Sequence, residues 1–428
     1  MSKKYVRRFI LPALILLVLG AALFLAWRLF FDPYRGTAQV WTDSAPLGTA
    51  LTAAQAREDL DYIAARVGAR HPACVKGLPD AVAAAYARES AAIGAGGDTT
   101  VLALWQAAAR VLHPLGDAHT GVRPLYGEIQ TLPVAFAFEG KTLTTPGGAV
   151  AKIDGVPVAI LYERFAGQFS YEMDAYARVR FAERINRMDT LRFVGIDPSG
   201  AVEIEYADGT TASYAFGKPT ASNAAAEPFV SFEIDGDVGL FTLRACDYND
   251  EYRDAVRRFF TAVRDGGIQN VILDLRDNPG GNSRVANAFI RYLPVSDYDT
   301  FSVDVRFGPF LWHNKAQTAK NDAADGLAFN GNLYVLTSAT TFSSAVDFAT
   351  LLSDNGLATL VGETPGNMPS SYGDVLSFQT PNAKLLFTVS YKRFVRPDAT
   401  KSDEPLLPDV AAAAPNAMDA ARALIGGL

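Results

Sequence analysis

The sequence predicts a mixed α/β protein behind one apolar N-terminal helix. Of its 428 residues, 49% are hydrophobic and 20% are charged, a balance typical of a globular chain. In the second half, strand-like apolar runs such as Leu333–Leu336 alternate with runs of helical spacing such as Ala345–Leu352. This alternation favours a layered α/β structure. The length leaves room for two or three domains.

The N-terminal apolar run, from Phe9 to Trp27, is close to the roughly 20 residues that cross a bilayer as a helix. By the positive-inside rule, the basic residues before it predict a cytoplasmic N-terminus and export of everything after Arg28. These residues are Lys3, Lys4, Arg7 and Arg8. The alternative is a signal peptide cleaved near Gly20–Ala22. Because the apolar run continues through Trp27, the sequence favours an uncleaved anchor.

Composition argues against several functions. The formal charge of −7 provides no basic surface for nucleic acid. The four histidines are scattered, and Cys74 and Cys246 are far apart, so no metal or redox spacing is present and we expect neither a metal nor a cofactor. The two cysteines are expected to be buried and unpaired. Nothing in the sequence indicates an oligomeric state.

The first part of the exported chain is alanine-rich and shows three helical patterns between Leu51 and Leu112, with His71 in a loop. The middle part predicts a strand over Leu132–Phe138 and a hairpin that turns at Asp208-Gly209. We therefore expect five parts along the chain. They are a stub and anchor over 1–35, a linker over 36–50, a helical region over 51–124, a small β/α module over 125–226, and an α/β core over 227–428.

The stretch from Ser338 to Thr364 predicts a strand–turn–helix–strand unit with two serines, Ser343 and Ser344, at the turn. A nucleophile needs this location, because a rigid strand holds it and the N–H groups of a helix start lie near it. The alternative is that these serines only cap the helix.

Two other segments carry groups that could serve such a nucleophile. Gly280 and Gly281 follow the apolar strand at Asn270–Arg276, and paired glycines allow close approach of a ligand to exposed N–H groups. An ordinary turn is the alternative. His119 lies in the polar turn Gly116–Thr120, and an imidazole there is a candidate general base. A solvated loop histidine is its alternative.

Three motifs in the second half together resemble one protease family. They are Leu273–Gly281, Thr341–Asp347 and Val361–Thr364. The resemblance is to the tail-specific, or carboxyl-terminal processing, serine protease family, which includes tricorn-like proteases and the repeats of the interphotoreceptor retinoid-binding protein. It extends roughly from Leu51 to the C-terminus and is most specific in the catalytic half. It implies a ββα spiral core like that of crotonase and Clp-type proteases, and a middle module that is PDZ-like at most.

The resemblance also implies roles for individual residues. Ser344 is the expected nucleophile, because the family's serine is followed by Ala-x-Asp or Ala-x-Glu, and His119 is the expected base, as in the tricorn-like branch. Asn367 stands where the Ser–Lys branch has its lysine, which excludes that dyad. Glu404 is the expected third catalytic residue. The remaining expectations are an oxyanion hole from Gly280, Gly281 and Ala345, and orienting carboxylates among Asp117, Asp347, Glu363 and Asp403.

The resulting expectation is a membrane-anchored serine endopeptidase that hydrolyses exported or envelope proteins and peptides through an acyl-enzyme. Its catalytic part is expected in the periplasm or at the cell surface, or secreted if the N-terminal segment is cleaved. One alternative is a catalytically silent protein that binds an apolar ligand or a peptide on the same scaffold. A second is a crotonase-like acyl-CoA enzyme, which export away from cytosolic CoA disfavours.

Overall fold

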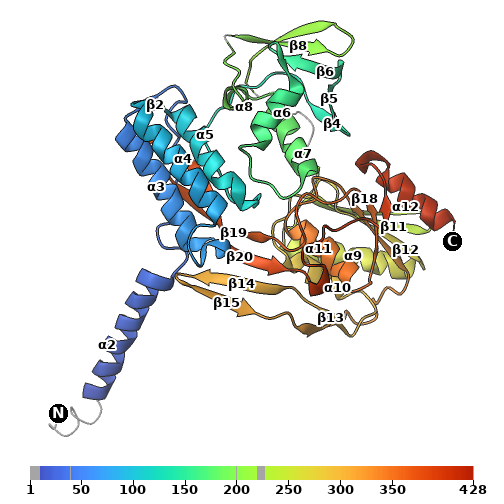
Figure 1. The fold of residues 1–428 in the computed structure, drawn as a ribbon. Coiled ribbons are helices and arrows are strands. Elements are labelled where there is room, and N and C mark those ends of the chain that lie inside the picture. Colours follow the sequence, from blue (N-terminus) through green and yellow to red (C-terminus); the bar gives the residue numbers. More distant parts are fainter. Residues whose placement is uncertain (1–9, 39, 199, 219–226, 428) are drawn as a thin grey trace.

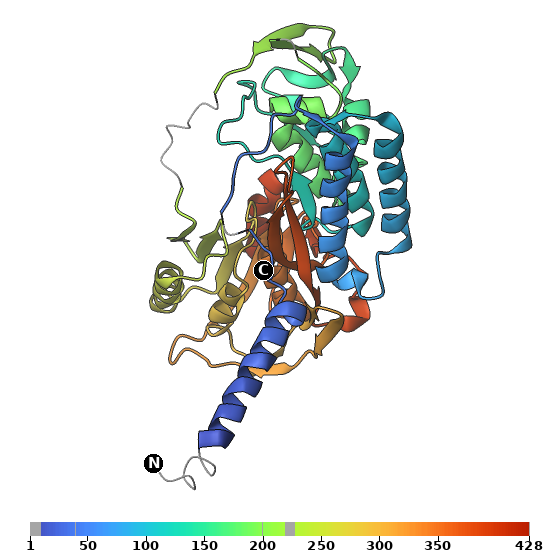
Figure 2. The same cartoon turned by 90° about the vertical axis from the view of Figure 1, so that its left-hand side faces the viewer.

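The computed structural model describes residues 10–38, 40–198, 200–218 and 227–427, so the basic residues before the apolar run lie outside the described part. Helix α2 (Leu11–Ala26) continues as a π-helical turn over Trp27–Phe31. Together they form the one helix in the described residues that is long and apolar enough to cross a membrane. It projects away from the body in both views (Figures 1 and 2). An anchor and a signal sequence share these properties.

The helical region contains the three helices that the sequence predicts. They are α3 (Ala53–Arg70), α4 (Asp80–Gly96) and α5 (Val101–Leu112). Helix α3 starts with a capping box, in which the Thr52 hydroxyl accepts a hydrogen bond from the Gln55 N–H at 3.2 Å and the Gln55 side chain accepts one from the Thr52 N–H at 3.0 Å. The two-stranded pair β1 (Ala50–Leu51) and β2 (Thr99–Thr100) ties the start of α3 to the start of α5.

The small module is a sheet of order β4-β5-β6-β8-β9, with the short β7 paired to β6. Its strands are β4 (Ala137–Glu139), β5 (Thr142–Thr145), β6 (Gly148–Ile153), β7 (Val156–Pro157), β8 (Ala201–Tyr206) and β9 (Thr211–Ala215). Its helices are α6 (Val158–Ala166), α7 (Asp174–Arg184) and α8 (Met188–Phe193). The predicted hairpin at Asp208-Gly209 is present as β8–β9. The strand predicted over Leu132–Phe138 is wrong for most of its length, because these residues alternate in burial without a strand partner until Ala137.

The second half is built on a six-stranded sheet of order β10-β11-β12-β17-β18-β21, antiparallel at β10–β11 and parallel elsewhere. The strands are β10 (Val230–Asp235), β11 (Val238–Leu243), β12 (Asn270–Asp274), β17 (Asn332–Thr337), β18 (Thr359–Gly362) and β21 (Val410–Ala411). The helices are α9 (Asp250–Asp265), α10 (Arg284–Ile290), α11 (Ser344–Asp354) and α12 (Ala417–Gly426). Every residue of β12 is buried, as expected of a parallel strand covered on both faces. The mixed α/β prediction is confirmed.

A second sheet joins the helical region to this core. Its order is β15-β14-β20-β19, and β3 pairs with β20. Its strands are β3 (Gly121–Arg123), β14 (Ser302–Phe307), β15 (Phe310–Asn314), β19 (Tyr372–Gln379) and β20 (Leu386–Val395). A separate pair, β13 (Asp297–Asp299) and β16 (Thr318–Lys320), lies at the periphery. Because β3 begins two residues after His119 and pairs antiparallel with β20, it fixes the loop that carries this histidine.

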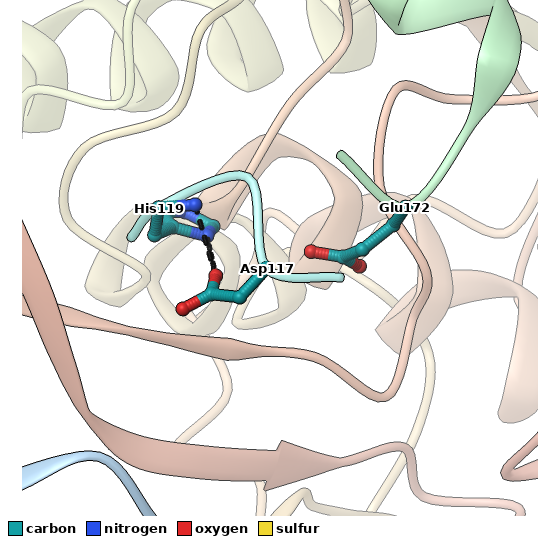
Figure 3. Close-up of side chains that lie close together, drawn as sticks. All are labelled: Asp117, His119 and Glu172. Atoms are coloured by element: carbon teal, nitrogen blue, oxygen red, sulfur yellow. Dashed lines mark hydrogen bonds and ion pairs between the residues drawn. The ribbon is translucent and has the colours of Figure 1, made fainter. Parts of the chain in front are cut away.

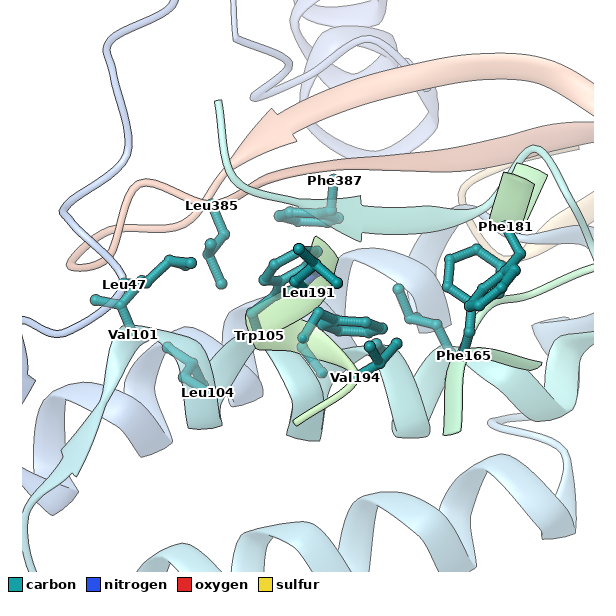
Figure 4. Packing of buried hydrophobic residues seen from close by; sticks show 14 of the residues in the cluster. Leu47, Val101, Leu104, Trp105, Phe165, Phe181, Leu191, Val194, Leu385 and Phe387 are labelled. Carbon is teal, nitrogen blue, oxygen red and sulfur yellow. The ribbon is translucent and has the colours of Figure 1, made fainter. Parts of the chain in front are cut away.

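One hydrophobic cluster spans α3–α5, the small module and the sheet that contains β20. Figure 4 shows Trp105 of α5 among side chains from all three parts, including Leu191 and Phe387. A second cluster packs α9, α10 and α11 on the six-stranded sheet. Cys74 and Cys246 are buried and unpaired, one in each cluster. The loop between α5 and β3 is therefore anchored at both ends in a single core.

Candidate active site

Ser343 occupies a strained turn between β17 and α11. Its backbone has φ 55° and ψ −127°, a conformation that costs a residue with a side chain about 1–3 kcal/mol. Its N–H donates a hydrogen bond to Asn367 Oδ1 at 2.6 Å, and its carbonyl accepts one from the Val346 N–H at 2.7 Å. The preceding residue, Phe342, donates its N–H to the Asn278 carbonyl at 2.9 Å. These contacts hold the side chain of Ser343 at the top of a sharp strand-to-helix turn, the geometry of a nucleophile elbow.

The Ser343 hydroxyl meets an imidazole. Its Oγ lies 3.0 Å from His119 Nε2. The His119 carbonyl accepts a hydrogen bond from Thr388 Oγ1 of β20 at 2.7 Å, and its ring lies 4.7 Å from the Phe342 ring, centroid to centroid. With 13% of its side chain exposed, His119 is held in place yet open on one side. A serine and a base within hydrogen-bond reach are the minimum for a nucleophilic hydroxyl.

Asp117 lies behind His119 and is completely buried. Its Oδ1 accepts the His119 backbone N–H at 2.9 Å and lies 3.6 Å from His119 Nδ1 (Figure 3). Its Oδ2 lies 3.2 Å from Nε2 of His71, which is in a loop, as predicted, and is fully buried. Because His71 Nδ1 accepts the Ala73 N–H at 3.2 Å, the His71 proton is on Nε2 and is donated to Asp117. The four groups form a chain from Ser343 to His71.

The buried ionisable groups of the site shift one another's pKa values. Burial would raise the pKa of Asp117, but its contacts with His119 and His71 hold that pKa well below its ordinary value. Burial opposes protonation of His119, but the negative charges of Asp117, Glu172 and Asp347 leave its pKa raised. Burial raises the pKa of Glu172 to about 8, and the nearby Asp117 adds to the effect. Burial also raises the pKa of Asp347 to about 7.

Two backbone N–H groups beside the Ser343 hydroxyl have no acceptor within the described residues: those of Gly281 and Ser344. The Cβ atom of an alanine at position 280 would lie 2.9 Å from the Ser344 nitrogen, so the glycine turn and the serine turn are in direct contact. The Gly280 N–H is already donated to Asn278 Oδ1 at 2.9 Å, and the Ala345 N–H to the Phe342 carbonyl at 3.2 Å. Of the predicted oxyanion donors, Gly281 alone is free to receive a developing negative charge.

The structure places Ser343, and not the predicted nucleophile Ser344, against His119. Ser344 is the first residue of α11, is 7% exposed, and donates its hydroxyl to the Gly281 carbonyl at 2.9 Å. It therefore does not face His119, because one step along a helix start rotates the side chain to another direction. Its position explains the fixed geometry of the Gly281 peptide.

The expected third residue, Glu404, is not brought to the site. Glu404 and Asp403 are exposed in the loop before β21, and neither contacts His119. Glu363 accepts the backbone N–H groups of Ala339 and Ala414, so it ties loops together instead of orienting the base. Of the predicted orienting carboxylates, only Asp117 touches His119.

An open cavity of about 410 Å³ adjoins the serine turn. His119, Gly281 and Ser343 line it, together with Asp347, which is half-buried and accepts no hydrogen bond from the described residues. Its other lining residues are Asn282, Ser283, Ser344, Ser371, Tyr372, Gly373, Asp374, Lys392 and Phe394. The cavity gives a ligand direct access to both the Ser343 hydroxyl and the Gly281 peptide.

The loop position of His71 is as predicted, but neither its contact with Asp117 nor Glu172 was predicted from the sequence. Glu172 lies in the loop before α7, and its Oε2 accepts the Met368 N–H at 2.8 Å, next to the Asn367 that binds Ser343. No local motif marks Glu172, since its partners lie in segments far along the chain. The sequence shows an asparagine, Asn367, where the Ser–Lys branch has its lysine. The structure adds that the Asn367 side chain accepts the Ser343 N–H.

Comparisons with known proteins concern the fold and the family of the chain. The model of Peptidase family S41 matches residues 237–412. Mature CPAF complexed with lactacystin superimposes with a TM-score of 0.65 at 14% identity, over 87% of this chain and 97% of its own. Another structure of mature CPAF gives 0.63 at 14% identity, over 87% and 95%.

The tricorn protease gives a TM-score of 0.41 at 13% identity, over 88% of this chain and 37% of its own, and supports no argument. No curated protein sequence matches the chain. At these identities the structural similarity shows a shared fold, and the family model adds the catalytic class. This match, over less than half of the chain, and the shared fold together indicate a serine peptidase similar to those of Peptidase family S41.

Proposed function

We propose that this chain is a membrane-anchored serine endopeptidase in which Ser343 is the nucleophile and His119 its general base. The observation that carries the proposal is the 3.0 Å contact between Ser343 Oγ and His119 Nε2, made by a serine on a strained strand-to-helix turn. The match to Peptidase family S41 supports a peptide or protein substrate. Exported or envelope proteins are the proposed substrates, because the N-terminal apolar helix supports export.

In the proposed reaction, Ser343 Oγ attacks the carbonyl carbon of the scissile peptide bond while His119 Nε2 accepts the hydroxyl proton. The same proton then passes to the leaving amine as the C–N bond breaks, which leaves an acyl ester on Ser343. A water molecule then attacks that ester while His119 Nε2 accepts its proton. As the bond between the acyl carbon and Ser343 Oγ breaks, the proton passes to Oγ, and the acid is released. Asp117 favours the protonated ring of His119 during these steps, and His71 holds Asp117 by donating to its other oxygen.

The proposed oxyanion hole consists of the Gly281 and Ser344 N–H groups. Each such donor typically lowers the barrier by about 3 kcal/mol. The Ser344 hydroxyl is a positioning group in this scheme, since its bond to the Gly281 carbonyl orients that peptide. The Asn367 side chain is also a positioning group, because its Oδ1 accepts the Ser343 N–H and so holds the backbone of the serine turn.

Aromatic contacts support the membrane anchor. Trp27 and Phe31, at the end of the N-terminal helix, pack against Phe307 and Phe310 of the β14–β15 hairpin with ring centroids 5.5 and 5.9 Å apart. Phe310 and Trp312 are 62% and 64% exposed. Aromatic side chains of this kind are enriched at the boundary between lipid and water. We propose that the hairpin rests on the outer surface of the bilayer.

The two serines should differ sharply in a peptidase assay. Ser343→Ala is expected to lower kcat/KM by at least about 10³-fold, because only binding and oxyanion stabilisation remain. Ser344→Ala is expected to stay within about tenfold of the wild type, since it loses one hydrogen bond worth about 1 kcal/mol. An inactive Ser344→Ala beside an active Ser343→Ala would assign the nucleophile to Ser344. Thermal unfolding of both variants controls for folding.

Gly280→Ala should damage catalysis through the serine turn. The added Cβ would lie 2.7 Å from both the Phe342 carbonyl and Ser343 Cβ, at a backbone φ of 93°. We expect kcat to fall at least about tenfold as the nucleophile shifts. Gly267→Ala is the matched control, because it has a φ of 63° but meets open space. It should cost about 1–2 kcal/mol of stability and leave kcat near that of the wild type. Equal kcat values for the two variants would contradict the proposed contact.

The hairpin's position is testable by fluorescence in vesicles that contain brominated lipid. Trp312 should be quenched, so Trp312→Phe should remove a measurable part of the quenching of the full chain. Trp105→Phe is the control, because Trp105 is 7% exposed and lies in the hydrophobic core. Quenching that is the same in Trp312→Phe and the wild type would show that the hairpin stands away from the lipid.

A further inference from the structure

Three side chains that offer metal-binding atoms meet behind the catalytic serine. One such atom from each of Asp117, His119 and Glu172 lies within 4.8 Å of the other two. They come from the loop after α5 and the loop before α7, and Figure 3 shows the Glu172 carboxylate pointing toward Asp117. No sequence motif indicates this cluster, because its members have no metal-ligand spacing along the chain.

Two buried polar atoms of the cluster have no hydrogen-bond partner in the described part of the chain: His119 Nδ1, whose contact with Asp117 Oδ1 at 3.6 Å is too long for one, and Glu172 Oε1. The other polar end of each side chain is satisfied, His119 Nε2 by the Ser343 hydroxyl and Glu172 Oε2 by the Met368 N–H. An unsatisfied buried polar atom costs about 1–3 kcal/mol. Two of them in one cluster therefore indicate a missing binding partner.

The spacing fits a metal ion better than a hydrogen bond. His119 Nδ1 and Asp117 Oδ1 are 3.6 Å apart, which is beyond the usual hydrogen-bond range. Two ligands of a tetrahedral zinc ion, with bonds of about 2.0–2.2 Å, lie roughly 3.4 Å apart. Imidazole nitrogen and carboxylate oxygen are both zinc ligands, and three protein ligands leave the fourth position open to water.

The charges of the cluster also favour a bound cation. Asp117 and Glu172 bring two carboxylates together, and among the described residues no lysine or arginine forms an ion pair with either. Asp117 is completely buried, whereas His119 and Glu172 are partly exposed, so an ion can enter from solvent past them. A divalent cation would neutralise the pair and satisfy both partnerless atoms.

We propose that Asp117, His119 and Glu172 form an inhibitory Zn²⁺ site in this protein. Coordination uses the lone pair of His119 Nδ1, so the single proton of the neutral ring must reside on Nε2. A protonated Nε2 cannot accept the Ser343 hydroxyl proton, and the nucleophile is not activated. The inhibition rests on the proposed function, whereas the binding of the ion does not.

Isothermal titration calorimetry with ZnCl₂ tests the binding. The protein is the full chain in detergent, carrying Ser343→Ala so that no self-cleavage occurs, and it is treated with a chelator and dialysed beforehand. We expect one ion per chain. Adding Glu172→Gln should weaken the affinity at least about tenfold, and adding His119→Ala should abolish the specific binding. Glu163→Gln, an exposed change on α6, is the matched control and should bind like the parent.

Absence of zinc binding, or equal zinc affinity of the parent and the Glu172→Gln variant, would overturn the proposed zinc site.

A peptidase assay of the wild type then tests the proposed inhibition. ZnCl₂ should inhibit, excess chelator should restore the rate, and Glu172→Gln should need at least about tenfold more zinc for half-inhibition relative to its own zinc-free rate. Stoichiometric binding without inhibition would overturn the inhibitory role alone. A wild type with no peptidase activity would count against the proposed function and leave the calorimetric result standing.

Discussion

The candidate site depends on one long-range pairing, between β3 and β20. His119 and Ser343 are 224 residues apart in sequence, and the pairing of Gly121–Arg123 with Leu386–Thr388 holds the histidine loop near the serine turn. Thr388 adds a hydrogen bond to the His119 carbonyl at that junction. The core around Trp105 then fixes the loop from the other side. A site divided between two folding units in this way requires both units to be docked before the base can reach the hydroxyl.

The serine turn stores strain that its surroundings offset. Ser343 holds an unfavourable backbone conformation, and three separate segments hold it there: the asparagine at 278, the asparagine at 367 and the first turn of α11. Gly280 packs so closely on this turn that a larger residue would collide with it. The result is a hydroxyl aimed at an imidazole with two free N–H groups beside it. Such prearranged donors stabilise a developing oxyanion without further reorganisation.

The α/β architecture and the segments that form the site could be predicted because each depends on a local sequence pattern. The strands, the paired glycines and the polar turn of His119 all carry signals over a few residues. The choice between Ser343 and Ser344 could not be made that way, since it depends on where α11 starts and on the backbone angles of a single residue. His71 and Glu172 were missed for another reason. Their partners, Asp117 and Met368, lie 46 and 196 residues away, and no spacing rule connects them.

The central claim is that Ser343, and not its neighbour, is the nucleophile. Its most direct test is to label the wild-type full chain with a fluorophosphonate and to localise the adduct by tandem mass spectrometry, with fragmentation between residues 343 and 344. We expect a phosphonyl group on Ser343 and none on Ser344, with labelling lost in His119→Ala. An adduct on Ser344 would contradict it, and the hydrogen bond drawn from Ser344 to the Gly281 carbonyl would then have to break in the active enzyme.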